Sequence, residues 1–150
     1  MQKKKKKLRS HCPVNFGLEA FGDKWALLIL RDIIFRGKKT FGEFLKSEEK
    51  FATNILTSRL EHLVEERILT KEPLAEDSRK DAYLLTEKGL DLIPVIFEIT
   101  LWSFKYDNKS EAKRIRSLVE LIKSDNRAIS KTIREKVKRG EGIVMDYVEK

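Results

Sequence analysis

The fold of this chain is decided by residues 40–89, TFGEFLKSEEKFATNILTSRLEHLVEERILTKEPLAEDSRKDAYLLTEKG. The stretch opens on Thr40-Phe41-Gly42-Glu43, which is a capping-box pattern. In such a box the hydroxyl accepts a hydrogen bond from the third amide of the helix, and the carboxylate reaches back to the cap. The pattern predicts a short helix that runs to about Ser47.

A second helix is expected after the polar turn 48–50. On a helical wheel its apolar residues fall together, which predicts a helix from about Thr53 to about Arg67 with one buried face. These apolar residues are Leu56, Leu60, Leu63 and Val64. The polar side chains of the segment are then expected to look outward or sideways.

From Ile68 to Thr86 the apolar pattern changes from a helical one to a strand-like one. Apolar residues flank the charged run 75–81, which predicts a hairpin of two strands around a charged turn. A helix, a turn, a helix and a basic-tipped hairpin are the parts of a winged helix-turn-helix, whose main use is reading duplex DNA. The predicted class is therefore mainly α with a small β-hairpin.

Two further helices are expected before this unit. Cys12 suits the N-cap of a helix and Pro13 its first position, where the missing N–H costs nothing. Gly22 ends that helix and Asp23 caps the next, 24–35, which is apolar nearly all round. A helix of that kind is predicted to be the buried centre of the domain.

After the unit, Thr86 is expected to cap one long helix that ends near Tyr106, with a kink at Pro94 because proline removes a backbone hydrogen bond. Residues 108–150 are charged but patterned, since apolar residues recur there at helical spacing. The two stripes are Ile115, Leu118, Val119 and Ile122, then Ile129, Ile133 and Val137. We expect a helical C-terminal extension, interrupted near its end by two glycines.

Charge divides the chain into three parts. Residues 1–10 carry six bases and no acids, which is typical of a flexible basic arm, solvated or touching phosphates. Residues 11–107, the predicted DNA-binding domain, carry fourteen bases against seventeen acids, and residues 108–150 carry twelve against seven. The net charge of +8 therefore comes from residues 1–10 and 108–150, and the predicted DNA-binding domain itself is slightly acidic. DNA binding would require bases gathered on one face of that unit.

Other composition features exclude several classes. No apolar run reaches the roughly 18 residues of a membrane span, and the N-terminal lysine run lacks the apolar segment of a signal peptide. A single cysteine, Cys12, cannot form an internal disulfide, so we expect a cytoplasmic protein. No HExxH, P-loop or GxGxxG pattern appears, and two histidines with one cysteine cannot fill a zinc site without carboxylates. We predict no enzyme activity, no metal and no cofactor.

Seven segments, in the family's order over residues 12 to about 104, resemble the HxlR-type winged helix regulators. They are Cys12-Pro13-Val14, Gly22-Asp23-Lys24-Trp25, Leu27-Leu28-Ile29-Leu30-Arg31, Phe41-Gly42-Glu43-Phe44, Ile55-Leu56-Thr57-Ser58-Arg59-Leu60, Tyr83-Leu84-Leu85-Thr86-Glu87-Lys88-Gly89 and Leu92-Ile93-Pro94-Val95. The resemblance implies a bacterial or archaeal transcription regulator that forms a homodimer through its first and last family helices. The tail from residue 108 is longer than is typical, and its apolar stripes are candidates to extend the dimer interface.

The helix from Thr53 to Arg67 is the predicted reader of the major groove, because short polar and amide groups near a helix N-terminus can reach base edges. The side chains that suit this role are Thr53, Asn54, Thr57, Ser58 and His62, with Arg59 able to reach the backbone. Phosphate contacts are expected from Arg79 and Lys80 in the hairpin and from Lys38, Lys39 and Thr40 at a helix N-terminus. Two such helices about a two-fold axis predict a palindromic operator in double-stranded DNA.

Cys12 is the chemically distinctive residue. A helix N-terminus, with His11 and a lysine-rich arm nearby, is expected to stabilise its thiolate and lower its pKa. Some members of the family that the chain resembles use the matching cysteine as a redox or electrophile sensor, through an intersubunit disulfide or an adduct that shifts DNA affinity. The alternative is a small N-cap residue without a sensing role.

Two further functions stay open on the sequence alone. A winged helix can serve as a protein-interaction module, and the salt dependence of DNA binding distinguishes this function from DNA reading. A pocket between the dimerising helices, lined by residues such as Phe97 and Trp102, is a candidate site for a small effector. Aromatic residues at helical spacing are, however, more often plain core.

Overall fold

The computed structural model describes residues 7–149, so most of the basic arm lies outside the described residues. The predicted class is confirmed, because the chain consists mainly of helices with one antiparallel two-stranded hairpin. In chain order the elements are α1 (Pro13–Phe21), α2 (Lys24–Arg36), α3 (Phe41–Leu45), α4 (Thr53–Glu65), β1 (Leu69–Leu74), β2 (Asp77–Leu85), α5 (Glu87–Leu90), α6 (Ile93–Tyr106), the 3-10 helix η1 (Glu111–Ile115), α7 (Arg116–Lys138) and α8 (Val144–Tyr147). No helix within residues 7–149 is both long enough and apolar enough to cross a membrane.

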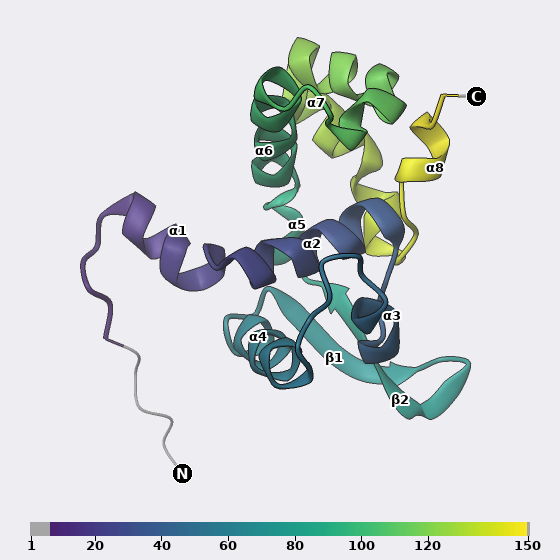
Figure 1. The fold of residues 1–150 in the computed structure, drawn as a ribbon. Helices are drawn as coiled ribbons and strands as arrows, with labels where there is room; N and C mark the ends of the chain where they lie inside the picture. The colour runs from purple at the N-terminus through teal and green to yellow at the C-terminus, as the bar shows by residue number, and fades with distance from the viewer. Residues whose placement is uncertain (1–6, 150) are drawn as a thin grey trace.

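Helix α2 forms the centre of the molecule, as its apolar sequence predicts. Asp23 caps it by accepting hydrogen bonds from the amides of Trp25 and Ala26, both at 3.0 Å, and Gly37 ends it in the left-handed conformation. The helices α3 and α4 and the hairpin lie on one side of α2, and α6 and α7 lie on the other (Figure 1). Buried side chains from both sides join those of α2 in one core.

The capping box before α3 is present but shifted. Thr40 accepts a hydrogen bond from the amide of Glu43 at 3.2 Å, as predicted. The Glu43 carboxylate accepts from the amide of Lys39 at 2.9 Å and not from the amide of the cap itself. The helix ends at Leu45, before the predicted Ser47, whose hydroxyl donates to a buried carboxylate of α2.

Helix α4 begins at Thr53, as predicted, after an N-cap, Ala52, that supplies no side-chain hydrogen bond. It ends at Glu65, two residues before the predicted end. Arg67 cannot continue the helix because it takes the left-handed backbone conformation, with φ of 58°.

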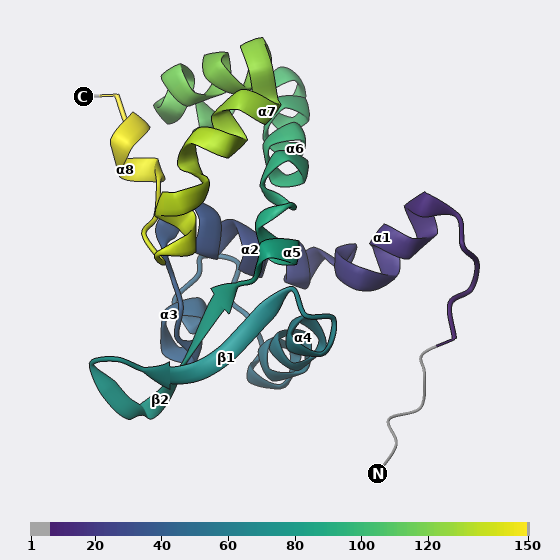
Figure 2. The ribbon, with the colours of Figure 1, turned by 180° about the vertical axis from the view of Figure 1, so that it is seen from behind.

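The hairpin pairs β1 with β2 in antiparallel register, with Leu69 opposite Leu85 (Figure 2). Its turn consists of residues 75 and 76 alone, so most of the charged run that we predicted as a turn belongs to β2. The amide of Tyr83 donates to the carbonyl of Lys39 at 2.8 Å. This bond ties the hairpin to the segment that leads into α3.

The single long helix predicted after Thr86 is wrong, because two helices occur there. Thr86 caps the short α5 by accepting from the amide of Gly89 at 3.1 Å. Helix α6 then begins at Ile93 with Pro94 in its first turn. Proline lacks an N–H, so it fits the start of a helix without the loss of a hydrogen bond that a kink in mid-helix involves.

The C-terminal extension folds onto its own chain. Both predicted apolar stripes are buried, and α7 lies beside α6 (Figures 1 and 2). Helix α7 is broken at Asp125, where the backbone is extended and the carboxylate accepts from the amide of Ala128 at 3.0 Å. A Cβ added to Gly142 would lie 2.5 Å from the carbonyl carbon of Arg36, so the extension also meets the end of α2 by close backbone approach. The stripes therefore contribute to the core of one subunit and are not free to extend a dimer interface.

Candidate nucleic-acid interface

Helix α4 has two clearly different faces. Leu56, Leu60 and Leu63 are buried, whereas four polar side chains in the first half of the helix are exposed: Thr53, Asn54, Thr57 and Ser58. The Thr57 hydroxyl donates to the carbonyl of Thr53 at 2.9 Å. Among residues 7–149, no partner hydrogen-bonds the side-chain amide of Asn54, so this amide is available to an outside group.

Two of the predicted contact residues face the protein. The Nε of Arg59 donates to Oδ2 of Asp23 at 2.7 Å, which joins α4 to the cap of α2. The Nε2 of His62 lies 3.1 Å and 3.0 Å from the carbonyl oxygens of Glu19 and Ala20 at the end of α1. These side chains hold α4 in place against the first two helices.

Lys38 is also directed inward. Its ammonium donates to Oγ of Ser47 at 2.8 Å and to Oδ2 of Asp32 at 3.3 Å. Asp32 is fully buried and also accepts from Arg31 at 2.8 Å and from Arg36 at 3.4 Å. A buried carboxylate is stable only with such partners, so this cluster holds the turn after α3 against α2.

This cluster and two lysines beside it were not predicted from the sequence. Asp32, within the apolar run of α2, was the sequence signal that polar partners must lie nearby. Lys46 and Lys50 are exposed in the turn between α3 and α4, and neither forms an ion pair with any residue in 7–149. A search for bases on both sides of the helix-turn-helix turn would have found them.

Arg79 and Lys80 lie in β2, in the irregular stretch 78–80 between the pair of Leu74 with Asp77 and the pair of Pro73 with Asp81, near the hairpin turn. The Arg79 side chain is 88% exposed, although its Nε donates to Oδ1 of Asp77 at 3.0 Å. That bond lowers the pKa of Asp77. Lys80 is exposed and forms no ion pair within the described part of the chain. The hairpin is the wing of the winged helix-turn-helix. Near its turn it exposes two bases, of which Arg79 is partly neutralised by Asp77.

Cys12 is exposed at the N-cap of α1, as predicted. The nearby backbone amides of Asn15 and Val14 lower the pKa of its thiol, although the sulfur accepts no capping hydrogen bond. This is the expected effect of free amides at a helix N-terminus on a thiolate. Within residues 7–149 no three His, Cys, Asp or Glu side chains gather as a metal site would require.

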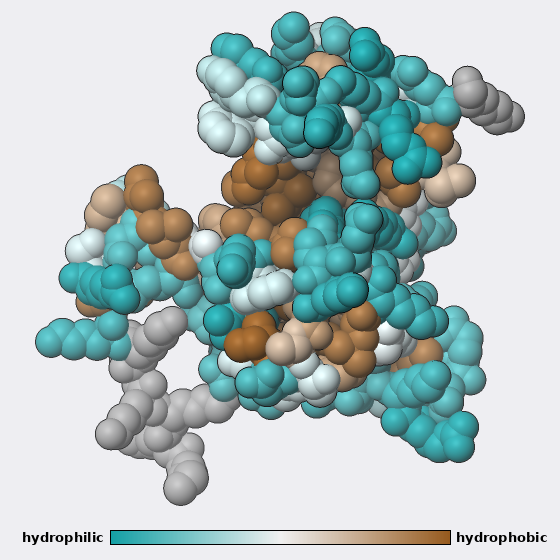
Figure 3. Space-filling model, in the orientation of Figure 1, coloured by the Kyte–Doolittle hydropathy of each residue, from teal (hydrophilic) through white to brown (hydrophobic). Residues whose placement is uncertain are grey.

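Two apolar stripes remain uncovered on the surface. On α1, which extends away from the rest of the chain (Figure 1), Val14 and Leu18 lie one helical turn apart and are 69% and 58% exposed. Apolar side chains are visible along this helix in Figure 3. On α6, Trp102 is 66% exposed and its ring packs on that of Tyr106, with centroids 5.2 Å apart. Contiguous apolar surface of this kind marks an interaction site.

The effector pocket predicted between the dimerising helices, with Phe97 and Trp102 in its lining, needs a second copy of the chain and stays a prediction. Phe97 is fully buried and packs on Phe35, with ring centroids 5.9 Å apart. Trp102 points outward on the other side of α6. The two rings therefore do not face each other across a cavity.

A family model described as HxlR-like helix-turn-helix matches residues 20–111. The chain belongs to the HxlR family. The HTH-type transcriptional regulator YdeP of Bacillus subtilis is 36% identical to this HxlR-family chain over 98 residues, which are 65% of this chain and 76% of YdeP. The solved structure of PA1607 has a TM-score of 0.61 and 39% identity, covering 69% of this chain and 70% of that one. The redox regulator HypR in its oxidised form has a TM-score of 0.58 and 31% identity, covering 65% of this chain and 99% of HypR.

This HxlR-family protein is therefore a transcriptional regulator of the helix-turn-helix type, and the family predicted from the seven sequence segments is confirmed. YdeP and HypR are both named as regulators, which is a non-enzymatic role. Residues 112–150 lie beyond the family match. The C-terminal extension is thus an addition to the common fold of the family.

Proposed function

We propose that this HxlR-family regulator binds duplex DNA sequence-specifically as a homodimer. The observation that carries the proposal is the exposed polar row of α4, opposite its buried leucine row. The buried face holds the helix rigidly on the core, and the exposed face is left to a partner. Short polar groups on a rigid helix suit the edges of base pairs in the major groove.

Within this proposal, Asn54 has the most specific role. A side-chain amide can pair in two places with adenine, whereas a hydroxyl such as that of Ser58 accepts several partners. Thr53 and Thr57 lie beside it on the exposed face. Arg59 and His62 are assigned to positioning, because their polar atoms already bond Asp23 and the end of α1.

Phosphate contacts are assigned to two groups of side chains around α4. Arg79 and Lys80 of the wing would hold one flank of the site. Lys39 and Thr40, at the start of α3, and the exposed lysines of the turn, Lys46 and Lys50, would hold the other. Lys38 supports this second group from inside, through Asp32 and Ser47. Contacts of this kind set the orientation of the protein on DNA but carry no sequence information.

The homodimer is supported by the two uncovered stripes on α1 and α6. Each is an apolar surface that a second copy can cover, and α1 and α6 correspond to the first and last helices that the family resemblance assigns to dimerisation. A two-fold axis would bring two α4 helices to one face of the dimer. The operator is then palindromic, with half-sites one helical turn or a multiple of it apart.

We further propose that Cys12 makes DNA binding responsive to oxidants or electrophiles. The thiol is exposed and its pKa is lowered, which favours the reactive thiolate. HypR, a structural neighbour, is named as a redox regulator. Two Cys12 thiols, one from each subunit, would form a disulfide by losing two protons and two electrons to an oxidant such as hydrogen peroxide, which is reduced to water.

The main experiment measures binding to DNA fragments from the region upstream of the protein's own gene, at several salt concentrations. We expect the logarithm of the affinity to fall with the logarithm of the salt concentration, by about 0.9 per phosphate contact.

The Asn54→Ala substitution should reduce binding to the operator by about tenfold while leaving binding to random DNA nearly unchanged. Equal loss on both kinds of DNA would remove Asn54 from base reading. No binding to any fragment at low salt would favour the protein-interaction module.

A matched pair of lysine variants tests the wing. Lys80→Ala should weaken binding to all sequences and lower the salt slope by about one contact. Lys131→Ala, an exposed lysine on α7, should change neither. Identical effects of the two substitutions would show that the wing makes no special contact.

The thiol is tested by its rate of alkylation at neutral pH. Cys12 should react faster than free cysteine, because more of it is thiolate, and Cys12→Ser should abolish the effect of peroxide on operator binding. A rate no faster than that of free cysteine, or an unchanged peroxide response in the serine variant, would eliminate the sensor role.

A further inference from the structure

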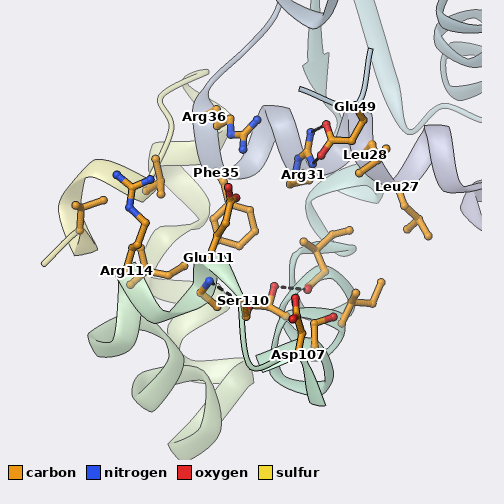
Figure 4. Close-up of a pocket in the computed structure, with 18 of the residues that line it drawn as sticks. Leu27, Leu28, Arg31, Phe35, Arg36, Glu49, Asp107, Ser110, Glu111 and Arg114 are labelled. Atoms are coloured by element: carbon orange, nitrogen blue, oxygen red, sulfur yellow. Dashed lines mark hydrogen bonds and ion pairs between the residues drawn. The ribbon is translucent and has the colours of Figure 1, made fainter. Parts of the chain in front are cut away.

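A pocket of about 840 Å³ lies between α2, α6 and the C-terminal extension (Figure 4). Helix α2 contributes one wall and α6 another. The remaining wall comes from η1 and α8, which lie mostly or wholly beyond the residues of the family match. The extension therefore converts the surface between two common helices into a pocket.

The body of the pocket is apolar. Leu28, Phe35, Ile96, Val144 and Met145 are among the side chains that line it. They come from three different elements, α2, α6 and α8, so the apolar lining depends on the docking of the extension. A pocket of this size with apolar walls and a few polar groups suits a small organic molecule.

One end of the pocket carries two guanidinium groups, and one of them has no partner among the described residues. There the side chains of Arg36 and Arg114 lie on either side of Glu111 (Figure 4). Among the described residues, no partner bonds the guanidinium of Arg114, and that of Arg36 makes a single bond, of 3.4 Å, to Asp32. Two guanidinium groups thus face one carboxylate, so a single acid group from a ligand would complete the charge balance.

The other charges of the lining are equal in number. Arg31 donates to Glu49 at 2.8 Å and lies in an ion pair with it. Lys24 and Asp107 also line the pocket and are of opposite sign, although neither forms an ion pair within residues 7–149. The excess of positive charge is therefore confined to the end formed by α2 and η1.

Two arginines of α2 that line the pocket connect it to the helix-turn-helix. Arg31 and Arg36 both bond the buried Asp32, which accepts from the hydroxyl of Ser47 in the turn between α3 and α4. A ligand acid that draws Arg36 into the pocket removes one partner from a fully buried carboxylate. Buried polar networks lose much of their stability when a partner leaves, so the turn that orients α4 would loosen.

We propose that this pocket binds an amphipathic organic monoanion, with its acid group between Arg36 and Arg114 and its apolar body against α2, α6 and α8, and that occupancy weakens DNA binding through Asp32 and Ser47. The effect on DNA rests on the proposed function, whereas the binding of the ligand does not.

The first experiment uses the full chain and anilinonaphthalene sulfonate, a dye with an apolar aromatic body and one sulfonate group. The dye should bind with increased fluorescence. Arg114→Gln should weaken binding by about tenfold, because a charge-assisted contact is lost, and Ala112→Trp should block it by filling the lining. The matched control is Arg116→Gln, an exposed arginine outside the lining, which should bind as the unchanged protein does.

Two results would overturn the site. Equal dye binding by the Arg114→Gln and Arg116→Gln variants would mean that no acid group sits beside Arg114. Dye affinity that falls as the protein concentration rises through its dimerisation range would mean that a second copy of this chain fills the groove. Circular dichroism on each variant separates loss of the site from loss of the fold.

The second experiment tests the coupling. With the dye bound, the amide of Lys50, which donates to the carbonyl of Ser47 at 3.0 Å, should exchange its hydrogen several-fold faster. Operator affinity should fall several-fold in the unchanged protein and stay constant in Arg114→Gln. Dye binding without faster exchange would overturn the coupling. A protein that binds dye but no DNA at all would contradict the proposed function while leaving the pocket supported.

Discussion

Helices α1 and α7 are both amphipathic, but the apolar side of α7 is buried whereas that of α1 is exposed. The apolar residues of α7, such as Leu118, Ile122 and Ile133, are at most 5% exposed. The apolar residues Val14 and Leu18 of α1 are 69% and 58% exposed. Helix α7 folds back on α6, whereas α1 extends away from the body (Figures 1 and 2). A helical apolar stripe therefore predicts that something covers it, but not whether the cover comes from the same chain.

The difference assigns separate tasks to the two ends of the chain. The C-terminal extension completes the subunit, since its stripes belong to the same core as α2 and α6. The N-terminal helix completes an assembly, which we propose is the homodimer. Substitutions in α7 should thus act on folding, and substitutions in α1 on association.

The largest effect is expected in α7. Ile133→Asp places a charge in the core and should lower the free energy of unfolding by about 4 kcal/mol, measured by urea denaturation. Lys131→Asp, an exposed position on the same helix, should change it by less than about 0.5 kcal/mol. Similar values for the two variants would show that α7 is not packed as part of the core.

The matching change in α1 is Leu18→Asp. It should raise the dissociation constant of the dimer about a hundredfold, because a charge replaces an apolar contact, as measured by analytical ultracentrifugation. The unfolding of the monomer should stay the same. Leu121→Asp, an apolar residue of α7 that is 45% exposed, is the control and should leave the dimer intact. A dimer unaffected by Leu18→Asp would place the interface elsewhere.

A smaller effect is expected where the extension meets α2. A Cβ at Gly142 would lie 2.5 Å from the backbone of Arg36, so Gly142→Ala should cost about 2 kcal/mol of stability. A Cβ at Gly42 meets nothing within 4 Å, so Gly42→Ala should not destabilise the protein. Thermal unfolding of both variants checks the pair, and equal melting temperatures would contradict the close approach.

The smallest effect concerns the ion pair between α2 and the helix-turn-helix turn. The guanidinium of Arg31 lowers the pKa of Glu49 from 4.5 to about 2. Because the folded pKa is the lower one, the pair stabilises the protein above pH 4.5 and loses this contribution as the pH falls towards 2. The contribution is about 1 kcal/mol, since water screens a partly exposed pair.

Acid unfolding of Glu49→Gln measures this contribution. The variant should be less stable than the unchanged protein at pH 7 and should match it near pH 2. Parallel stability curves over the whole range would show that the ion pair does not stabilise the fold.

Local signals predicted most of the elements correctly. Asp23 before an apolar run, Pro13 after a capping position and the leucines of α4 each depend on neighbours within one or two helical turns. The errors arose where one local pattern suits two structures. Pro94 fits both a kink within a helix and the first turn of a new helix. The contact of α5 with β2 determines that a new helix begins there.

The candidate site was predicted less completely, for a related reason. Asn54, Thr57 and Ser58 were placed on the exposed face because that face is opposite the leucines. Lys38 and His62 were expected among the contacts. The partners of His62 at the end of α1 lie 42 and 43 residues earlier in the chain, whereas Asp32, the partner of Lys38, is only six residues away but lies within an apolar run. The pocket was missed altogether, because its walls come from α2, α6 and α8.

The sequence by itself determined the winged helix-turn-helix, its family and the exposed polar face of α4, because capping patterns and apolar periodicity act over a few residues. Only the tertiary structure decided that the extension covers α6, that α1 stays uncovered, and that Asp32 connects a pocket to the turn before α4. Apolar stripes and charges attract any suitable partner, and the path of the whole chain determines which partner each one meets.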